Sequence, residues 1–366
     1  MSATRKPILS RLLCLVLMLC MLPVAAPAES GTCSSVSAAV SFVRGQAEAL
    51  AESFDFSYTS SMRGTLLGND DALWDMLNNA GIFDAKVTYS GSRIFVSDIT
   101  YYSGFKAYHA DRMGKTELLS KDEKTILKKA KSIVAKARKS CKNDLAMEKY
   151  LHDYLISHVT YKLGKSDGKY HANDSAIGAL KNGKAECDGY ADAFYLLGRL
   201  GGLDVDLQSG TGSSGGGHMW DLVCLSGTWY AVDVTYDDPD YKKNKKMAQY
   251  ACLNVGQDQL VDHSWYPALA AHATARYTDW DLFPYSAPNG SAIRTGYYFE
   301  TVKDAAAYFY SQFRSKHKQI HAMVKGKKTA EAMKKAIRKK FAKRSYSYTF
   351  WCTELNGYTV FDIIFK

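Results

Sequence analysis

Residues 218–235 read HMWDLVCLSGTWYAVDVT, two runs of alternating character joined by Ser226-Gly227. Alternation with a period of two is typical of strands, and a two-residue turn containing glycine joins two strands into a hairpin. In the register set by that turn, His218 and Asp233 lie on the same face as diagonal neighbours. A shift of one residue would place the two side chains on opposite faces of the hairpin.

Diagonal neighbours on a hairpin lie about 7 Å apart at the backbone, which is within side-chain reach. Asp233 can therefore orient the imidazole of His218 and stabilise its protonated form, while His218 can accept and later deliver a proton. Asp233 also interrupts the apolar run at 229–234, where an unpaired charge is costly. Taken singly, a histidine at a strand edge or an aspartate in a strand is more often structural than catalytic.

A candidate nucleophile lies upstream, where the polar loop GKAE at 183–186 runs into CDGYADAFYLL at 187–197. Cys187 falls at the start of the predicted helix, where unpaired N–H groups and the positive end of the helix dipole favour a thiolate. Single cysteines are more often small buried hydrophobes, so this interpretation depends on the two partners. Together the residues predict an activated nucleophile with an oriented base, Cys187–His218–Asp233.

Three motifs in this order resemble the transglutaminase-like superfamily. CDGYA at 187–191 resembles the family's Cys-x-Gly-Tyr-Ala element, and HMWD at 218–221 resembles its His-Ala-Trp-Asn element. WYAVDVTYDDP at 229–239 is similar to the element Trp-Tyr-x-Val-Asp-x-Thr-Trp-Asp-Asp-Pro. The resemblance covers roughly residues 144–264.

The resemblance implies an α+β fold with a papain-like core, in which the nucleophile helix packs against an antiparallel sheet that carries the histidine and the aspartate. It also implies a secreted bacterial-type thiol enzyme that acts on amide bonds through a thioacyl intermediate. Met219 and Asp221 stand where alanine and asparagine are commoner, outside the proposed triad.

The oxyanion hole is only partly indicated. The backbone N–H of Cys187 is one expected donor, and a second should come from an upstream side chain. The sequence leaves three candidates open: Tyr170, His171 and Asn173. We expect no cofactor and no metal, because the cysteine spacings match no zinc pattern.

The chain divides into a catalytic unit at 116–285 and two flanking stretches, 29–115 and 291–366. In each flank a helix, a strand, a second helix and a hairpin follow one another. The predicted elements are 36–51, 54–58, 69–77 and 86–101 in the first flank and 302–313, 319–324, 329–341 and 346–365 in the second. We hypothesise that the flanks are copies of one small α/β module, which requires the same strand order in both.

Residues 1–28 predict a cleaved secretory signal peptide. A basic head containing Arg5, Lys6 and Arg11 precedes an apolar run at 12–24, and Ala-Pro-Ala at 26–28 supplies small residues for cleavage. A membrane anchor is the alternative, although the run is short for a bilayer span. We therefore expect a secreted or cell-surface protein.

The charge is concentrated in the C-terminal flank. The whole chain carries +10, and from Ser291 onward sixteen Lys and Arg oppose five Asp and Glu. Such a basic module favours an anionic partner such as a cell-wall polymer or lipid headgroups, with an ordinary solvated helix face as the plain alternative. The run KKNKK at 242–246 lacks organised aromatic residues, so we expect no nucleic-acid binding. The oligomeric state is not indicated.

Six cysteines follow the predicted signal. If Cys187 stays free for catalysis, the other five cannot all pair within the chain, and the sequence gives no connectivity: Cys33, Cys141, Cys224, Cys252 and Cys352.

Three functions fit these features. The first is a cysteine peptidase or amidase with water as acyl acceptor, and the second is a transglutaminase that passes a glutamine acyl group to an amine. Both share the first half-reaction, and an aqueous compartment with an open glycine-rich rim at 210–217 favours hydrolysis. The third is a non-catalytic binding or scaffold protein on the same fold, which an intact triad disfavours.

Overall fold

The computed structural model describes most of the chain beyond residue 29. The described residues are 30–62, 70–164, 170–212, 215–238, 252–257, 260, 263–269, 272, 274, 298–299, 301–315, 319–342, 347–355 and 358–365. The predicted signal peptide at 1–28 lies outside the described residues, as does the run at 242–246. No described helix is long and apolar enough to cross a membrane.

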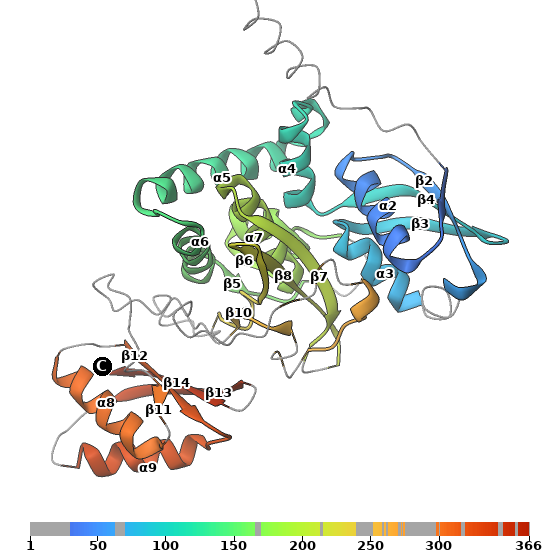
Figure 1. Ribbon diagram of the computed structural model, residues 1–366. Helices are drawn as coiled ribbons and strands as arrows, with labels where there is room; N and C mark the ends of the chain where they lie inside the picture. The colour runs from blue at the N-terminus through green and yellow to red at the C-terminus, as the bar shows by residue number, and fades with distance from the viewer. Residues whose placement is uncertain are drawn as a thin grey trace, which may run out of the picture.

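The catalytic unit is built from one buried helix and one antiparallel sheet. Helix α7 (Cys187–Gly201) packs against a sheet of order β10-β9-β8-β7 (Figure 1). The strands are β7 (Asp204–Thr211), β8 (Gly217–Leu225), β9 (Thr228–Val232) and β10 (Leu253–Val255). Residues 189–198 of α7 are all buried, so this helix is the centre of the core.

Three further helices surround α7. They are α4 (Ser103–Arg112), α5 (Lys121–Ser140) and α6 (Asp144–His158), and each packs directly on it. Side-chain caps stabilise the starts of two of them: Ser120 and Glu123 form a capping box on α5, and the Asn143 side chain caps α6. Short parallel strands β5 (Thr160–Tyr161) and β6 (Lys184–Ala185) lead into α7.

The hairpin β8–β9 has the register expected from its turn. Leu225 pairs with Thr228, and both turn residues, Ser226 and Gly227, have positive φ, as a primed two-residue turn requires. The returning strand is shorter than the alternation predicted, because β9 ends at Val232 and a turn follows.

The two flanking modules share one topology. The first has β1 (Ser30–Cys33), α2 (Val36–Glu48), β2 (Phe54–Tyr58), α3 (Asp70–Asn79), β3 (Ile82–Ser90) and β4 (Arg93–Tyr101). The second has β11 (Tyr298–Phe299), α8 (Val302–Arg314), β12 (Gln319–Lys325), α9 (Ala330–Lys340), β13 (Tyr348–Leu355) and β14 (Tyr358–Phe365). Their strand orders, β1-β2-β4-β3 and β11-β12-β14-β13, correspond strand for strand, as the duplication hypothesis requires.

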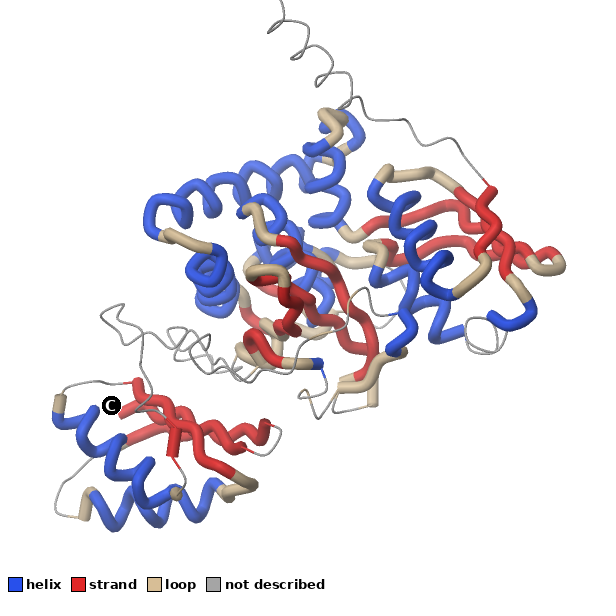
Figure 2. Tube along the Cα trace, viewed as in Figure 1, coloured by secondary structure: helices blue, strands red, loops and turns tan. Residues whose placement is uncertain are grey.

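The N-terminal module is joined to the catalytic unit by buried contacts. Both contribute to one continuous apolar core, whereas the C-terminal module has a core of its own. Asn79 of α3 accepts a hydrogen bond from Ser209 N–H on β7 at 2.6 Å, and Arg44 of α2 pairs with Asp206 at 2.9 Å. Figure 2 shows α3 beside the end of the β7–β8 pair.

The fold is therefore α+β, with the nucleophile helix on an antiparallel sheet. The sequence missed the short strands β1 and β11, helix α4 and the π-helical turn at Ile177–Asn182. None of the six cysteines after the predicted signal is in a disulfide.

Candidate active site

Cys187 is the first residue of α7. Its predecessor Glu186 has an extended backbone and makes no side-chain capping bond, so the first-turn N–H groups of α7 are not closed by a cap. The Cys187 side chain is half-buried and lines a cleft of about 310 Å³. A sulfur at an uncapped helix N-terminus lies in the positive end of the helix dipole, which favours its anionic form.

His218 and Asp233 meet across the hairpin as the sequence predicted. His218 lies near the start of β8, and its Nε2 is 2.7 Å from Oδ2 of Asp233, just beyond the end of β9. Asp233 is fully buried, whereas His218 keeps a small exposed edge on the cleft. Because Nε2 is held by the carboxylate, Nδ1 is the ring nitrogen left to face Cys187.

The electrostatics couple all three groups. Burial disfavours a charge on His218, but the Asp233 carboxylate and the hydrogen bond to Cys187 raise its pKa to about 11. Burial also works against an ionised Asp233, yet His218 and His263 hold the pKa of its carboxyl well below the usual range. The Asp233 carboxylate therefore favours the imidazolium form of His218.

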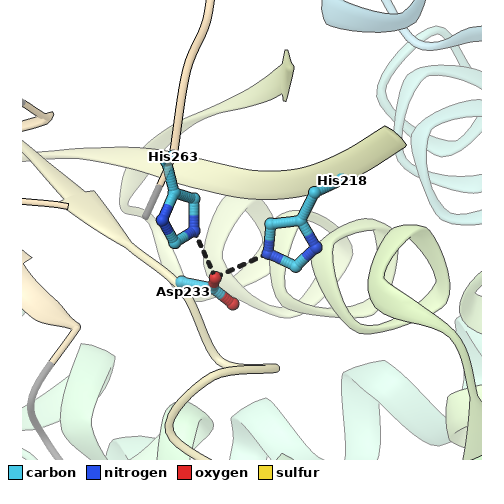
Figure 3. A group of neighbouring side chains, drawn as sticks. All are labelled: His218, Asp233 and His263. Atoms are coloured by element: carbon cyan, nitrogen blue, oxygen red, sulfur yellow. Dashed lines mark hydrogen bonds and ion pairs between the residues drawn. The ribbon is translucent and has the colours of Figure 1, made fainter. Parts of the chain in front are cut away.

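A second histidine, His263, binds the same carboxylate oxygen. Its Nε2 lies 2.8 Å from Oδ2 of Asp233, and Figure 3 shows the two imidazoles approaching this oxygen from opposite sides. The ring of His263 stands edge-on to Trp220 at 4.9 Å between centroids. Sequence reasoning missed His263, although it ends the segment that resembles the family beyond the core; the bridge Thr211–Ser264 brings it back to the sheet.

The carboxylate of Asp233 is fixed at both oxygens. Oδ1 accepts a hydrogen bond from Tyr236 N–H at 3.0 Å, while Oδ2 takes the two histidines. The turn that follows Asp233 is stabilised by a separate contact. Nε2 of the buried His152 on α6 lies 3.1 Å from Oδ2 of Asp237. A buried carboxylate with this many donors has little freedom to rotate.

His263→Phe is expected to lower kcat/KM by about 10-fold, because Asp233 loses one of the hydrogen bonds that fix it. Phenylalanine keeps a ring against Trp220, so the fold should be retained. His263→Gln, which carries an N–H near the position of Nε2, should recover much of the loss. Steady-state kinetics on the three proteins checks this, and equal activity of the Phe and wild-type proteins would contradict it.

His218, Asp233 and His263 also offer three ligand atoms within 4.8 Å of one another. Two imidazoles and a carboxylate are a donor set that metals such as zinc accept. Here Oδ2 already lies at hydrogen-bonding distance from both ring nitrogens, so the groups satisfy one another without an ion.

The cleft lies between the catalytic unit and the N-terminal module. The catalytic unit contributes Glu186, Cys187, Asp188, Ser209, Gly210, Gly217, His218 and Met219, and the N-terminal module with its connection to α4 contributes Asp75, Asn78, Phe83 and Tyr102. Asp75 is fixed by a hydrogen bond from the Ser209 hydroxyl. The sequence did not indicate that an N-terminal segment forms one wall.

None of the three upstream candidates for the oxyanion hole lines this cleft. The Tyr170 hydroxyl accepts a hydrogen bond from Ser103 N–H at 2.9 Å, and the Asn173 amide donates to the Lys162 carbonyl at 3.2 Å. His171 is held through its backbone N–H by Asp174.

Asp221 stands where the related motif commonly has asparagine. It is fully buried, and neither carboxyl oxygen has a hydrogen-bond partner among the described residues. Burial and the nearby carboxylates raise its pKa well above the usual value. The side chain is therefore neutral, as an asparagine would be.

Sequence comparisons find similarity to known proteins over part of this chain. The model of the transglutaminase-like superfamily matches residues 131–234, which include all three triad positions. Human kyphoscoliosis peptidase is 29% identical over 104 residues, 25% of this chain and 16% of that protein. The mouse protein is 25% identical over 128 residues, 32% of this chain and 19% of that protein. The chain thus spans less than a fifth of the length of these relatives.

Solved structures give only distant similarity. A crystal structure of a TGase shares 16% identity at a TM-score of 0.29, covering 52% of this chain and 53% of that one. A candidate cysteine protease from Cytophaga hutchinsonii shares 14% identity at a TM-score of 0.26, covering 42% and 65%. The similarity rests instead on the matched segment and its motifs: residues 131–234 match the model of the transglutaminase-like superfamily.

Proposed function

We propose that this protein is a secreted cysteine-nucleophile hydrolase that cleaves amide bonds of peptides or proteins through Cys187, His218 and Asp233. The observation that carries the proposal is the position of His218. It is held by Asp233 at 2.7 Å, Cys187 contributes to its raised pKa, and it opens with the cysteine onto one cleft. A structural histidine has no need of this combination.

In the first half-reaction the Cys187 thiolate attacks the carbonyl carbon of the amide, and the carbonyl oxygen becomes an oxyanion. The oxyanion accepts a hydrogen bond from the backbone N–H of Cys187 at the start of α7. When the tetrahedral intermediate collapses, the C–N bond breaks and the His218 imidazolium gives its proton to the departing amine. The product is a thioacyl enzyme.

In the second half-reaction His218, now neutral, accepts a proton from water as the oxygen attacks the thioester. Collapse releases the carboxylic acid and restores the thiolate–imidazolium pair. Asp233 keeps Nε2 protonated throughout, so that the other ring nitrogen performs both proton transfers. A cleft of about 310 Å³ lies at the small end of ligand sites and suits an extended side chain or a short peptide segment.

The basic C-terminal module is proposed to hold the enzyme at an anionic surface, a cell-wall polymer or lipid headgroups. Its helix α9 exposes Lys335, Arg338, Lys339 and Lys340, while Met333 and Ile337 face the module's own core. Sedimentation with anionic vesicles should be lost on adding salt and on replacing these four side chains with glutamine. Retention by the replaced protein at low salt would refute the proposal.

The reaction type is tested by incubating the protein with a mixed peptide library, with and without a primary amine, and reading products by mass spectrometry. Shortened peptides mean backbone hydrolysis, and deamidated glutamines mean side-chain hydrolysis; either supports the proposal. Amine adducts in preference to hydrolysis would make the protein a transglutaminase. No product in any arm would leave a non-catalytic binding protein as the better account.

A further inference from the structure

Tyr102 belongs to the N-terminal wall of the cleft and immediately precedes α4, which packs on the nucleophile helix. It links β4 to α4, and its backbone N–H donates to the Gly81 carbonyl at 2.9 Å. The side chain is only 3% exposed, and that exposure is on the cleft that also contains Cys187. Its ring stands edge-on to Phe83 at 5.5 Å between centroids, and this contact supports its position.

The backbone next to Tyr102 is fixed on α7 itself. The N–H groups of Gly104 and Phe105 donate to the buried Asp192 carboxylate at 2.7 and 2.8 Å. A Cβ at Gly104 would overlap the Asp192 carbonyl oxygen, which shows how closely the two chains approach. Asp192 lies on α7 five residues after Cys187, so the start of α4 is held about one and a half turns along the same helix.

The Tyr102 hydroxyl is free to bind a ligand. Among the described residues it has no hydrogen-bond partner, although burial, Asp188 and Cys187 all act on it and raise its pKa well above the usual value. It is therefore a neutral O–H donor at the pH of catalysis. A hydroxyl that lines a reactive cleft without a partner in the protein is available to a substrate group.

We propose that the Tyr102 hydroxyl is the second donor of the oxyanion hole, opposite the backbone N–H of Cys187. When the thiolate forms its bond to the carbonyl carbon, the C=O π pair moves to oxygen, and the Tyr102 O–H donates a hydrogen bond to that oxyanion. No proton is transferred in this contact, and the proton for the leaving amine still comes from His218. The N-terminal module is thus part of the catalytic machinery rather than an appendage.

Other donors near the cleft fit this role less well. The Ser209 hydroxyl donates to Asp75, and the hydroxyl of Tyr170 is already paired with Ser103. The Asn78 amide also lines the cleft, but its helix α3 packs on β7 rather than on the nucleophile helix. Asn78 is therefore the competitor that the experiment has to exclude.

The inference rests on the proposed function. Tyr102→Phe tests it, because this substitution removes the hydroxyl and leaves the ring in place. We expect kcat on a peptide cleaved by the wild type to fall about 100-fold with little change in KM, as for loss of one oxyanion donor. The rate of Cys187 alkylation by iodoacetamide should be unchanged, because that reaction forms no oxyanion. A structural defect would lower both rates together.

Tyr101→Phe is the matched control. Its hydroxyl donates to the Ala51 carbonyl at 2.7 Å, away from the cleft, so this variant should turn over like the wild type. Wild-type turnover by Tyr102→Phe would overturn the inference, as would a 100-fold loss in Asn78→Ala that Tyr102→Phe does not show. If the wild-type protein itself neither cleaves peptides nor alkylates rapidly, the proposed function fails instead.

Discussion

Cys187→Ala is expected to abolish turnover, with a loss of at least about 10⁴-fold, while the protein stays folded. The sulfur forms the covalent intermediate, and the Ser209 hydroxyl that also lines the cleft is held by Asp75. The Cys187 side chain is half-buried at a helix terminus, so an alanine leaves little cavity there. Peptide cleavage and thermal unfolding of the same sample check both parts.

Cys141→Ala is the control for this prediction. Cys141 is also a half-buried free thiol at a helix end, but it contacts the Ala146 carbonyl at 3.3 Å outside the cleft. Full activity is expected from it. If Cys187→Ala retained substantial turnover, the thioacyl mechanism would be wrong, whatever the behaviour of the control.

Asp233→Asn is expected to lower kcat/KM by roughly 10² to 10⁴-fold without unfolding the protein. Asp233 accepts from His218, His263 and Tyr236 N–H, so every partner at this site is a donor. An asparagine must turn its NH₂ group toward at least one of them. If it faces His218, that imidazole has to present a bare Nε2 and carry its proton on the nitrogen that faces Cys187.

That tautomer cannot accept the thiol proton, which is the origin of the expected loss. Loss of the negative charge at Asp233 should also lower the activity. The Asp233 carboxylate helps to raise the pKa of His218 to about 11, so removing the negative charge lowers that pKa and weakens the imidazolium–thiolate pair. The defect should therefore be greatest at low pH, where an unassisted thiol is protonated.

Asp204→Asn serves as the matched substitution. Asp204 is at the exposed end of β7, where its side chain is 70% accessible and pairs with Arg199 at 3.0 Å. Ion pairs on the surface contribute little to the free energy of unfolding, so the activity and stability of Asp204→Asn should be close to those of the wild type. The orienting role assigned to Asp233 would be refuted by unchanged turnover in Asp233→Asn.

The hairpin could be predicted from sequence because its determinants are local. Ser226-Gly227 sets the turn, and the side-chain period of two then fixes which face His218 and Asp233 occupy. The start of α7 could also be predicted from the sequence, because a polar glycine-containing loop precedes a long apolar run. These two local patterns and the family resemblance identified the three proposed triad positions.

His263 and the N-terminal wall could not be found in this way. His263 reaches Asp233 only because residues 211 and 264 pair across 53 positions of the chain. The contact of Asp75 with Ser209 joins residues 134 positions apart. Contacts of this kind depend on how finished elements pack, and no local periodicity records them.

Helix α4 was missed for a related reason. It contains Gly104 near its start and lacks an apolar stripe, since Ser103, Gly104 and His109 are buried along with its apolar residues. The helix is stabilised from outside, by Asp192 at its first N–H groups and by Tyr195 at His109. Its formation therefore depends on α7 being in place.

The rate at which iodoacetamide alkylates Cys187 between pH 5 and pH 9, followed by peptide mapping, tests the central claim most directly. Because the pKa of His218 is raised to about 11, its imidazolium persists below that pH and should keep Cys187 reactive at pH 6. In His218→Ala the reaction should disappear at pH 6 and return only toward pH 8.5, as for an ordinary thiol. Equal profiles for the two proteins, or ordinary reactivity of wild-type Cys187, would contradict the assignment of this cleft as a thiol active site.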